Sequence, residues 1–167
     1  IPMFFFDDID RVDEFAGLSS KTTHANIECI DGCRLLARML WACLSGIRIR
    51  RVLLAGIKME YTPRIADLSA PISYLNKTRA DISGSGYVVQ SLEAALWVFA
   101  NTTSYREAVL MAANLGDDAD TTAAVVGQLA GAYYGMEGIP QEWLDKLHDK
   151  DMIVSLADRL YNLRESK

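Results

Sequence analysis

Three carboxylates occur within four consecutive positions at residues 116–122, whose sequence is Gly-Asp-Asp-Ala-Asp-Thr-Thr. They are Asp117, Asp118 and Asp120, and the hydroxyl of Thr121 follows directly. Oxygen-only ligands favour a hard divalent cation such as Mg²⁺ or Mn²⁺ over zinc. A bound cation would also relieve the repulsion among three neighbouring negative charges. These residues are therefore the first candidates for a metal site.

Helix capping is the alternative explanation for these acids, because an apolar helix is predicted to start around Asp120. Acidic side chains near a helix N-terminus gain roughly 0.3 to 1 kcal/mol each from the helix dipole. That accounts for one or two carboxylates, whereas a third adds repulsion beside an apolar helix that excludes screening solvent. An EF-hand is excluded, because the twelfth position counted from Asp117 is Gln128 rather than a bidentate glutamate.

Two other segments combine polar side chains with small residues. Residues 20–26 are Ser-Lys-Thr-Thr-His-Ala-Asn, and His24 precedes a predicted helix start, where unpaired backbone N–H groups can bind an anion. An isolated histidine is more often a surface or capping residue than a catalytic one. Residues 83–87 are Ser-Gly-Ser-Gly-Tyr. The glycines allow close approach of a ligand, and Tyr87 offers a ring face and a hydroxyl, although many inter-helix turns have this composition.

Apolar residues recur at helical spacing along the chain and predict an all-α fold, a compact bundle of orthogonally packed helices. Asn26 and Ser104 are the expected N-caps of two of these helices. Convincing alternating strands are absent from the pattern. The predicted helices are about 9–18, 26–45, 49–59, 88–99, 104–115, 120–134, 141–147 and 151–163, with short helical turns between 63 and 86.

The helix that follows the acidic turn is rich in glycine and alanine. Gly127, Gly131 and Gly135 recur every four residues along it. Glycine inside a helix costs roughly 1 kcal/mol relative to alanine, so these positions need compensating contacts. We therefore predict that residues 120–135 form the central helix, which neighbouring helices approach closely.

The composition fits one domain and excludes several classes of protein. Half of the 167 residues are hydrophobic, and the net charge of −5 argues against a nucleic-acid partner. No run of about 18 uncharged apolar residues predicts a membrane span. Three cysteines argue against a disulfide framework and favour a reducing, cytoplasmic compartment, and Cys29 and Cys33 are interpreted as small core residues. The chain starts at Ile1 and Pro2, as though it were cut from something longer.

Three segments taken together resemble the ADP-ribosylglycohydrolases, including their dinitrogenase-reductase-activating glycohydrolase-like members. They are Thr-His-Ala-Asn at 23–26, Ser-Gly-Ser-Gly-Tyr-Val-Val at 83–89 and Gly-Asp-Asp-Ala-Asp-Thr-Thr-Ala-Ala at 116–124, in the family's order and approximate spacing. Residues 127–135 are similar to the family's central helix. The resemblance covers the whole chain but only the C-terminal portion of the family's usual length. Residues 1–167 are thus expected to form a single domain, the C-terminal part of that fold.

The resemblance implies a magnesium-dependent hydrolase that cleaves the ribose C1″ glycosidic bond of ADP-ribosylated protein side chains or related ADP-ribose conjugates. The family's site holds two Mg²⁺ ions, and Mn²⁺ is an alternative. Its Asp-x-Asp-Thr signature maps onto Asp118, Asp120 and Thr121 as metal ligands, and the two aspartates are the expected catalytic residues. Asp117 stands where the family often has glycine. The implied substrate-binding residues are His24 near the diphosphate and Gly84, Ser85, Gly86 and Tyr87 along the cleft.

The chain departs from the family at its start. The early Thr-Asp-Asp-Thr motif, which supplies the remaining metal ligands, and the Gly-Asn-Gly segment are absent. Five acidic residues lie between positions 7 and 14, and we interpret these early acids as a solvated helix start. A missing N-terminal segment of the same protein is therefore expected to complete the site, and the chain alone is expected to be inactive. The alternative is a non-enzymatic ADP-ribose-binding protein or a structural relic of the family. The early acids are Asp7, Asp8, Asp10, Asp13 and Glu14.

Overall fold

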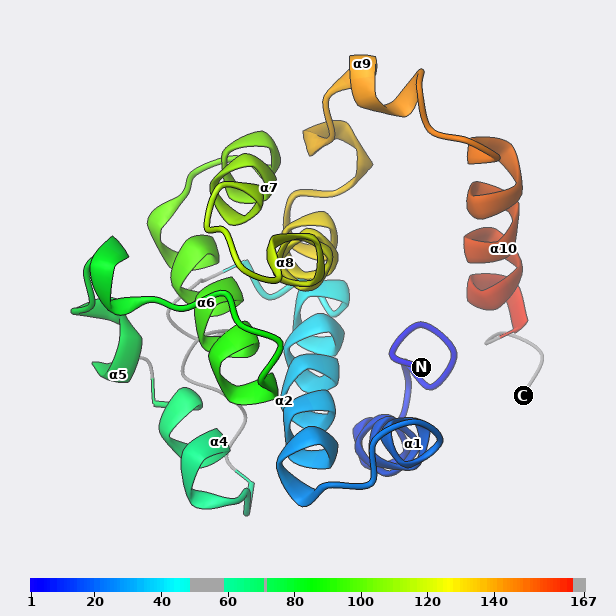
Figure 1. Cartoon of the computed structure of the whole chain (residues 1–167). Helices are drawn as coiled ribbons and strands as arrows, with labels where there is room; N and C mark the ends of the chain where they lie inside the picture. Colours follow the sequence, from blue (N-terminus) through cyan, green and yellow to red (C-terminus); the bar gives the residue numbers. More distant parts are fainter. Residues whose placement is uncertain (49–58, 71, 164–167) are drawn as a thin grey trace.

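Figure 1 shows the computed structural model of the chain, which describes all residues except 49–58, 71 and 164–167. The helix expected at 49–59 lies almost entirely outside the described residues. The described residues form helices and contain no strand, which confirms the all-α prediction. The helices are α1 (Ile9–Lys21), α2 (Ile27–Leu44), α4 (Pro63–Leu68), α5 (Ile72–Leu75), α6 (Val88–Asn101), α7 (Tyr105–Ala113), α8 (Ala119–Tyr134), α9 (Gln141–Leu144) and α10 (Lys150–Asn162), with single 3₁₀ turns at Arg79–Asp81 and Met136–Gly138.

Side-chain caps determine where α2 and α7 begin. The Oδ1 atom of Asn26 accepts a hydrogen bond from the backbone N–H of Glu28 over 2.9 Å, as the sequence predicted. The Oγ atom of Ser104 likewise accepts from the N–H of Glu107 over 3.1 Å. Helix α7 ends at Ala113, two residues before the predicted end. The Asn26 cap, two residues after His24, thus fixes the start of α2.

Helix α8 lies against α7, α6 and α2, which confirms its prediction as the central helix (Figure 1). Its residues Val126, Leu129 and Ala130 are buried in the main core. This burial of apolar surface is the main source of the bundle's stability. The α6 helix supplies much of the opposite side of that core, from Leu92 to Phe99.

The glycine stripe of α8 faces an aromatic ring on α7. A Cβ atom built on Gly127 would lie 3.6 Å from the Oη atom of Tyr105, and one built on Gly131 would lie 3.7 Å from its Cε2 atom. The ring of Tyr105 therefore packs along the stripe, which supplies the compensating contact that interior glycines need. Gly135 ends α8 with a φ of +76°, a backbone conformation that residues with a Cβ atom rarely adopt.

An ion-pair network joins α1 to α2 and corrects one expectation. Asp13, interpreted from the sequence as part of a solvated helix start, is only 7% exposed. Its two carboxylate oxygens accept hydrogen bonds from Nε of Arg34 and from Nε of Arg38, each over 2.7 Å. Asp31 accepts from Nη1 of Arg34 over 2.9 Å and from the backbone N–H of Thr62 over 2.7 Å. The prediction was wrong because the acidic pattern of one helix does not show the arginines on the next.

Helix α10 differs from the others, because none of its residues is buried. It lies at the edge of the molecule, apart from α2 and α8 (Figure 1). Over the described part of the chain, no helix combines the length and the apolar character that a membrane crossing requires.

Candidate functional site

The acidic turn is held in place by contacts to the glycine loop, which we define as residues 83–87. Asp118 is the N-cap residue of α8, and its backbone N–H donates a hydrogen bond to the carbonyl oxygen of Gly84 over 2.9 Å. The hydroxyl of Thr121 donates to Oδ1 of Asp118 over 2.8 Å. That bond orients the carboxylate while the lone pairs of the hydroxyl stay available. Asp120 is exposed in the first turn of the same helix.

Two consecutive residues with positive φ reverse the chain just before α8. Gly116 has a φ of +82° and Asp117 a φ of +54°. Aspartate is one of the few non-glycine residues that adopts this left-handed conformation readily. Asp117 is exposed, and it lies in the turn itself rather than in the helix. Its position gives it a role in the turn, and we do not count it among the site residues.

The glycine loop approaches the acidic turn so closely that a side chain at Gly84 or Gly86 would force a neighbouring atom to shift. A Cβ atom built on Gly84 would lie 3.1 Å from the carbonyl oxygen of Gly116, and one built on Gly86 would lie 3.2 Å from Oδ2 of Asp118. Both distances are tighter than ordinary carbon–oxygen contacts, so the missing side chains are what allow this packing. The oxygen Oδ2 of Asp118 therefore faces the loop, and the structure brings these two predicted segments together.

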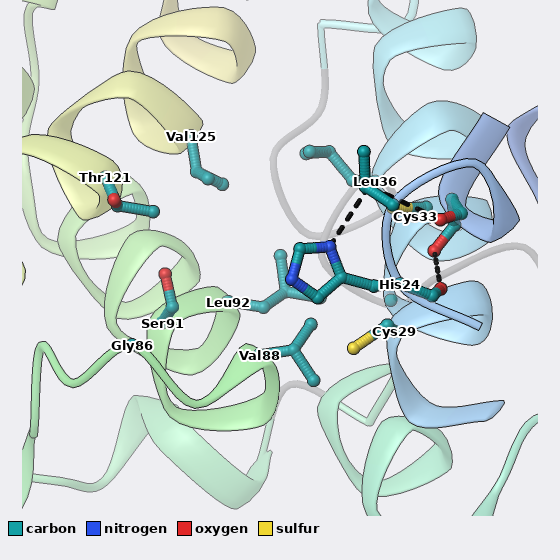
Figure 2. A pocket seen from close by; sticks show the side chains of 13 residues that line it. His24, Cys29, Cys33, Leu36, Gly86, Val88, Ser91, Leu92, Thr121 and Val125 are labelled. Carbon is teal, nitrogen blue, oxygen red and sulfur yellow. Dashed lines mark hydrogen bonds between the residues drawn. The ribbon is translucent and has the colours of Figure 1, made fainter. Parts of the chain in front are cut away.

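A cavity of about 280 Å³ lies between α2, α6 and α8. Figure 2 shows the imidazole of His24 projecting into it from the turn between α1 and α2, opposite Gly86 and Thr121. Residues from all three predicted segments thus line one space. The walls are mostly apolar, which suits an organic ligand with an apolar or aromatic part more than a bare ion. The lining residues are Ser20, Thr23, His24, Cys29, Gly32, Cys33, Leu36, Gly86, Val88, Ser91, Leu92, Thr121 and Val125.

His24 is held by a short local contact. Its Nδ1 atom lies 3.0 Å from the hydroxyl oxygen of Thr23, and its backbone N–H donates to the carbonyl of Ser20 over 2.7 Å. The side chain is exposed, so the far ring nitrogen is accessible to a ligand. The ring lies directly before the N-terminus of α2, where backbone N–H groups favour an anion.

Two cysteines on α2 also line the cavity, which corrects their interpretation as core residues. Cys33 is exposed and Cys29 is half-buried. Burial raises the pKa of the Cys29 thiol above its usual value, and the neighbouring Cys33 and Glu28 raise it further. The sequence pattern placed both residues on one helical face correctly, but it did not show that this face borders a cavity.

Tyr87 lies at the rim of the cavity and is bound by two side chains that the sequence analysis did not single out. Its hydroxyl donates to Oε2 of Glu28 over 2.7 Å and accepts from Nη1 of Arg64 over 2.7 Å. Ser85 accepts from the backbone N–H of Tyr87 over 3.3 Å and bonds the side chain of Gln90. The contacts of Glu28 and Arg64 with Tyr87 join residues far apart in sequence, so only the fold reveals them.

Two buried hydroxyls beside the site have no hydrogen-bond partner among the described residues: Thr122 Oγ1 and Ser91 Oγ. Thr122 is fully buried, and its Oγ1 atom would lie 3.6 Å from a Cβ atom on Gly84. An unpaired buried hydroxyl costs free energy, so each of these atoms can still take a hydrogen bond from water or a ligand. Both hydroxyls were missed because serine and threonine in apolar helices ordinarily bond their own backbone.

The donor set fits part of a site for a hard divalent cation. Asp118, Asp120 and Thr121 offer carboxylate and hydroxyl oxygens, the ligands that Mg²⁺ prefers. Within the part of the chain that the structure describes, however, no three His, Cys, Asp or Glu side chains converge closely enough to hold a metal ion. The described residues therefore offer at most part of the ligand set that such an ion needs.

The fold and this arrangement define a class of protein: an all-α domain in which an acidic helix start meets a glycine loop beside an apolar cavity. The chain belongs to the ADP-ribosylglycohydrolase family, whose sequence profile matches residues 1–167.

Individual relatives agree with this assignment. The chain is 42% identical over 143 residues to ADP-ribosylarginine hydrolase Tri1 of Pseudomonas putida, a match that covers 86% of this chain and 38% of that protein. It is 40% identical over 148 residues to ADP-ribosylarginine hydrolase Tri1 of Serratia proteamaculans, covering 85% and 38%.

A solved structure described as an ADP-ribosylglycohydrolase-related protein complex superimposes with a TM-score of 0.86 at 32% identity. The match covers 98% of this chain and 56% of the solved chain. The chain therefore spans well under two thirds of the length of these relatives.

Proposed function

We propose that this chain contributes the Asp118 side of a site at which an ADP-ribose conjugate is hydrolysed at its ribose C1″ atom. The observation that carries the proposal is the hydrogen bond from Asp118 to Gly84, which joins the acidic turn to the glycine loop beside a cavity that His24 enters. The family membership and the names of the relatives support the choice of substrate. An ADP-ribosylated arginine side chain is the conjugate to test first, because both Tri1 relatives carry that name.

In this proposal water adds to C1″, the bond from C1″ to the side-chain nitrogen breaks, and the proton from water goes to the leaving nitrogen. Asp118 and Asp120 place negative charge where the ribose develops positive, oxocarbenium-like charge. Together with Thr121 they would hold Mg²⁺ or Mn²⁺, which when bound orients ribose hydroxyls and water. His24 and the N-terminus of α2 bind the diphosphate. Gly84, Ser85, Gly86 and Tyr87 shape the wall against the ribose.

The rest of the site is proposed to come from polypeptide outside this chain. The described residues hold no cluster of three metal-binding side chains, and relatives are about twice as long. A hard cation held by fewer fixed charges keeps more water and binds more weakly. We also propose a reducing, cytoplasmic compartment, because an odd number of cysteines argues against a disulfide framework.

A non-enzymatic ADP-ribose-binding role is the second candidate, and the same incomplete cluster favours it. Binding needs only the cavity, His24 and the loop, whereas hydrolysis also needs precise positioning, worth roughly 7 to 11 kcal/mol of barrier.

The test is ADP-ribose release from an ADP-ribosylated arginine protein with excess Mg²⁺ or Mn²⁺. This chain is assayed alone and together with the polypeptide that corresponds to the uncovered part of the Tri1 relatives. We expect release only from the combination, and loss of release in Asp118→Asn. Asp117→Asn is the matched control, because it removes a neighbouring carboxylate and asparagine tolerates the left-handed turn. Tight ADP-ribose binding without any release from the combination would instead support the binding role.

A further inference from the structure

Three side chains form a hydrogen-bonded group at the cavity rim, which we call the rim triad: Glu28, Arg64 and Tyr87. The Tyr87 hydroxyl donates to Glu28 and accepts from Arg64, each over 2.7 Å. The Arg64 guanidinium also lies 5.9 Å from the centre of the Tyr87 ring. Nε of Arg64 is 3.9 Å from Oε1 of Glu28. Both hydrogen-bonding capacities of the phenol are thus used, with a charged partner on each side.

The triad joins three elements next to the cavity. Glu28 lies in the first turn of α2, directly before the lining residue Cys29. Arg64 lies on α4. Tyr87 is the N-cap residue of α6, between the lining residues Gly86 and Val88. The end of the glycine loop is therefore tied to the helix whose N-terminus follows His24.

Stabilisation of the fold is a weak explanation for this group. The Arg64 side chain is 66% exposed and that of Glu28 is 25% exposed. Ion pairs at such exposure contribute little to the free energy of unfolding. The two partners instead restrict the side-chain conformation of Tyr87, because an exposed tyrosine otherwise samples several rotamers. With both partners in place, one ring orientation is selected before a ligand arrives, and this lowers the entropy lost on binding.

We propose that Glu28 and Arg64 are positioning residues, which hold the Tyr87 ring at the cavity rim for a nucleoside diphosphate ribose. The inference rests on the proposed function for the identity of the ligand. Its structural part, that the two residues order the ring, stands on the contacts alone.

The first measurement follows the Tyr87 ring by NMR relaxation of its aromatic carbons in the free 167-residue chain. We expect Glu28→Ala to increase ring mobility, and Glu28→Gln to preserve most of the order because the amide oxygen still accepts the phenol proton. Glu93→Ala is the matched control. It removes an ion pair between α6 and Lys77, in which Oε1 of Glu93 lies 2.7 Å from Nζ of Lys77, and neither residue belongs to the rim triad. Unchanged ring mobility in Glu28→Ala would overturn the proposal, whether or not the chain binds ligand.

The second measurement is the ADP-ribose Kd of the same variants, by NMR titration into the millimolar range. Loss of the hydrogen bond between Tyr87 and Glu28 predicts binding about two- to tenfold weaker in Glu28→Ala. Tyr87→Phe also loses the bond from Arg64, so it should weaken binding at least as much. The double variant should bind no more weakly than Tyr87→Phe alone, because Tyr87→Phe already breaks the contact that Glu28→Ala removes. Additive losses would contradict the positioning role. A wild-type chain that binds no ADP-ribose, with or without the polypeptide covering the rest of the relatives, would contradict the proposed function, while ring mobility still decides whether the triad orders Tyr87.

Discussion

The backbone N–H of Asp118 donates to the carbonyl oxygen of Gly84 over 2.9 Å, and this bond fixes the acidic turn against the glycine loop. Both groups belong to the backbone, so the contact does not use the side chain of Asp118. The carboxylate of Asp118 therefore stays available for a ligand, with Thr121 bound to one of its oxygens. The geometry of the site depends on backbone packing as much as on the acids themselves.

Gly84→Ala tests that packing. The new Cβ would lie 3.1 Å from the carbonyl oxygen of Gly116 and 3.5 Å from Cβ of Leu115. Because both are backbone or near-backbone atoms, we expect the loop to shift and the free energy of unfolding to fall by about 1 to 3 kcal/mol. Denaturant unfolding measures the change, with Ser83→Ala in the same loop as the control. Equal stabilities of the two variants would show that the loop is not tightly packed against the turn.

The glycine stripe of α8 gives a pair of substitutions with opposite signs. Gly131→Ala places a Cβ 3.7 Å from the Tyr105 ring, an ordinary contact, and gains helix propensity of up to about 1 kcal/mol. Gly131→Leu overpacks the same contact, at a cost of about 1 to 3 kcal/mol. Thermal unfolding should therefore rank alanine at or above glycine, and leucine below both. A leucine variant as stable as the wild type would mean that Tyr105 does not pack on this stripe.

Removal of Asp13 should destabilise the protein strongly. Its carboxylate bonds both Arg34 and Arg38, and Arg38 is only 5% exposed. Asp13→Ala leaves a buried guanidinium without its partner, which typically costs about 3 to 5 kcal/mol. Asp10→Ala, an exposed acid in the first turn of the same helix, is expected to cost at most about 1 kcal/mol. Chemical denaturation of the two variants compares them directly, and similar losses would contradict a buried network.

Thiol alkylation reports on the cavity wall. We expect Cys33, which is exposed, to react first, and Cys29 more slowly. Burial raises the pKa of Cys29, and it raises that of the fully buried Cys43 to about 11, so little reactive thiolate forms at pH 8. Mass spectrometry of iodoacetamide adducts gives the order. ADP-ribose should slow the reaction of Cys33 in the folded protein. The control is Cys43 in denatured protein, whose labelling should not depend on ADP-ribose. Equal labelling of folded Cys33 with and without ligand would place the ligand elsewhere.

Local features of the fold were predictable because they depend on near neighbours in sequence. Asn26 and Ser104 cap helices as predicted, and the boundaries of the central helix differ by one residue at its start. Side-chain environment was not predictable in the same way. Asp13 was predicted to be solvated, but the structure buries it. Its arginine partners lie on the next helix, so the local sequence pattern does not reveal them.

The candidate site shows the same division. The acidic turn, His24 and the glycine loop could be identified from residue types and resemblance, and the structure places them around one cavity. Glu28 and Arg64 could not, because their contact with Tyr87 spans 59 and 23 positions in sequence. The metal-ligand roles of Asp118, Asp120 and Thr121 and the catalytic roles of the two aspartates remain predictions.

The most direct measurement of the central claim is an NMR titration of the chain with substoichiometric Mn²⁺, whose unpaired electrons broaden the signals of nearby nuclei. We predict that the amide signals of Gly84, Gly86, Asp118 and Thr121 broaden first. Asp118→Asn should abolish this selectivity, and Asp117→Asn should retain it. Broadening that instead centres on the acidic residues 7–14, or that is the same in Asp118→Asn, would contradict the account.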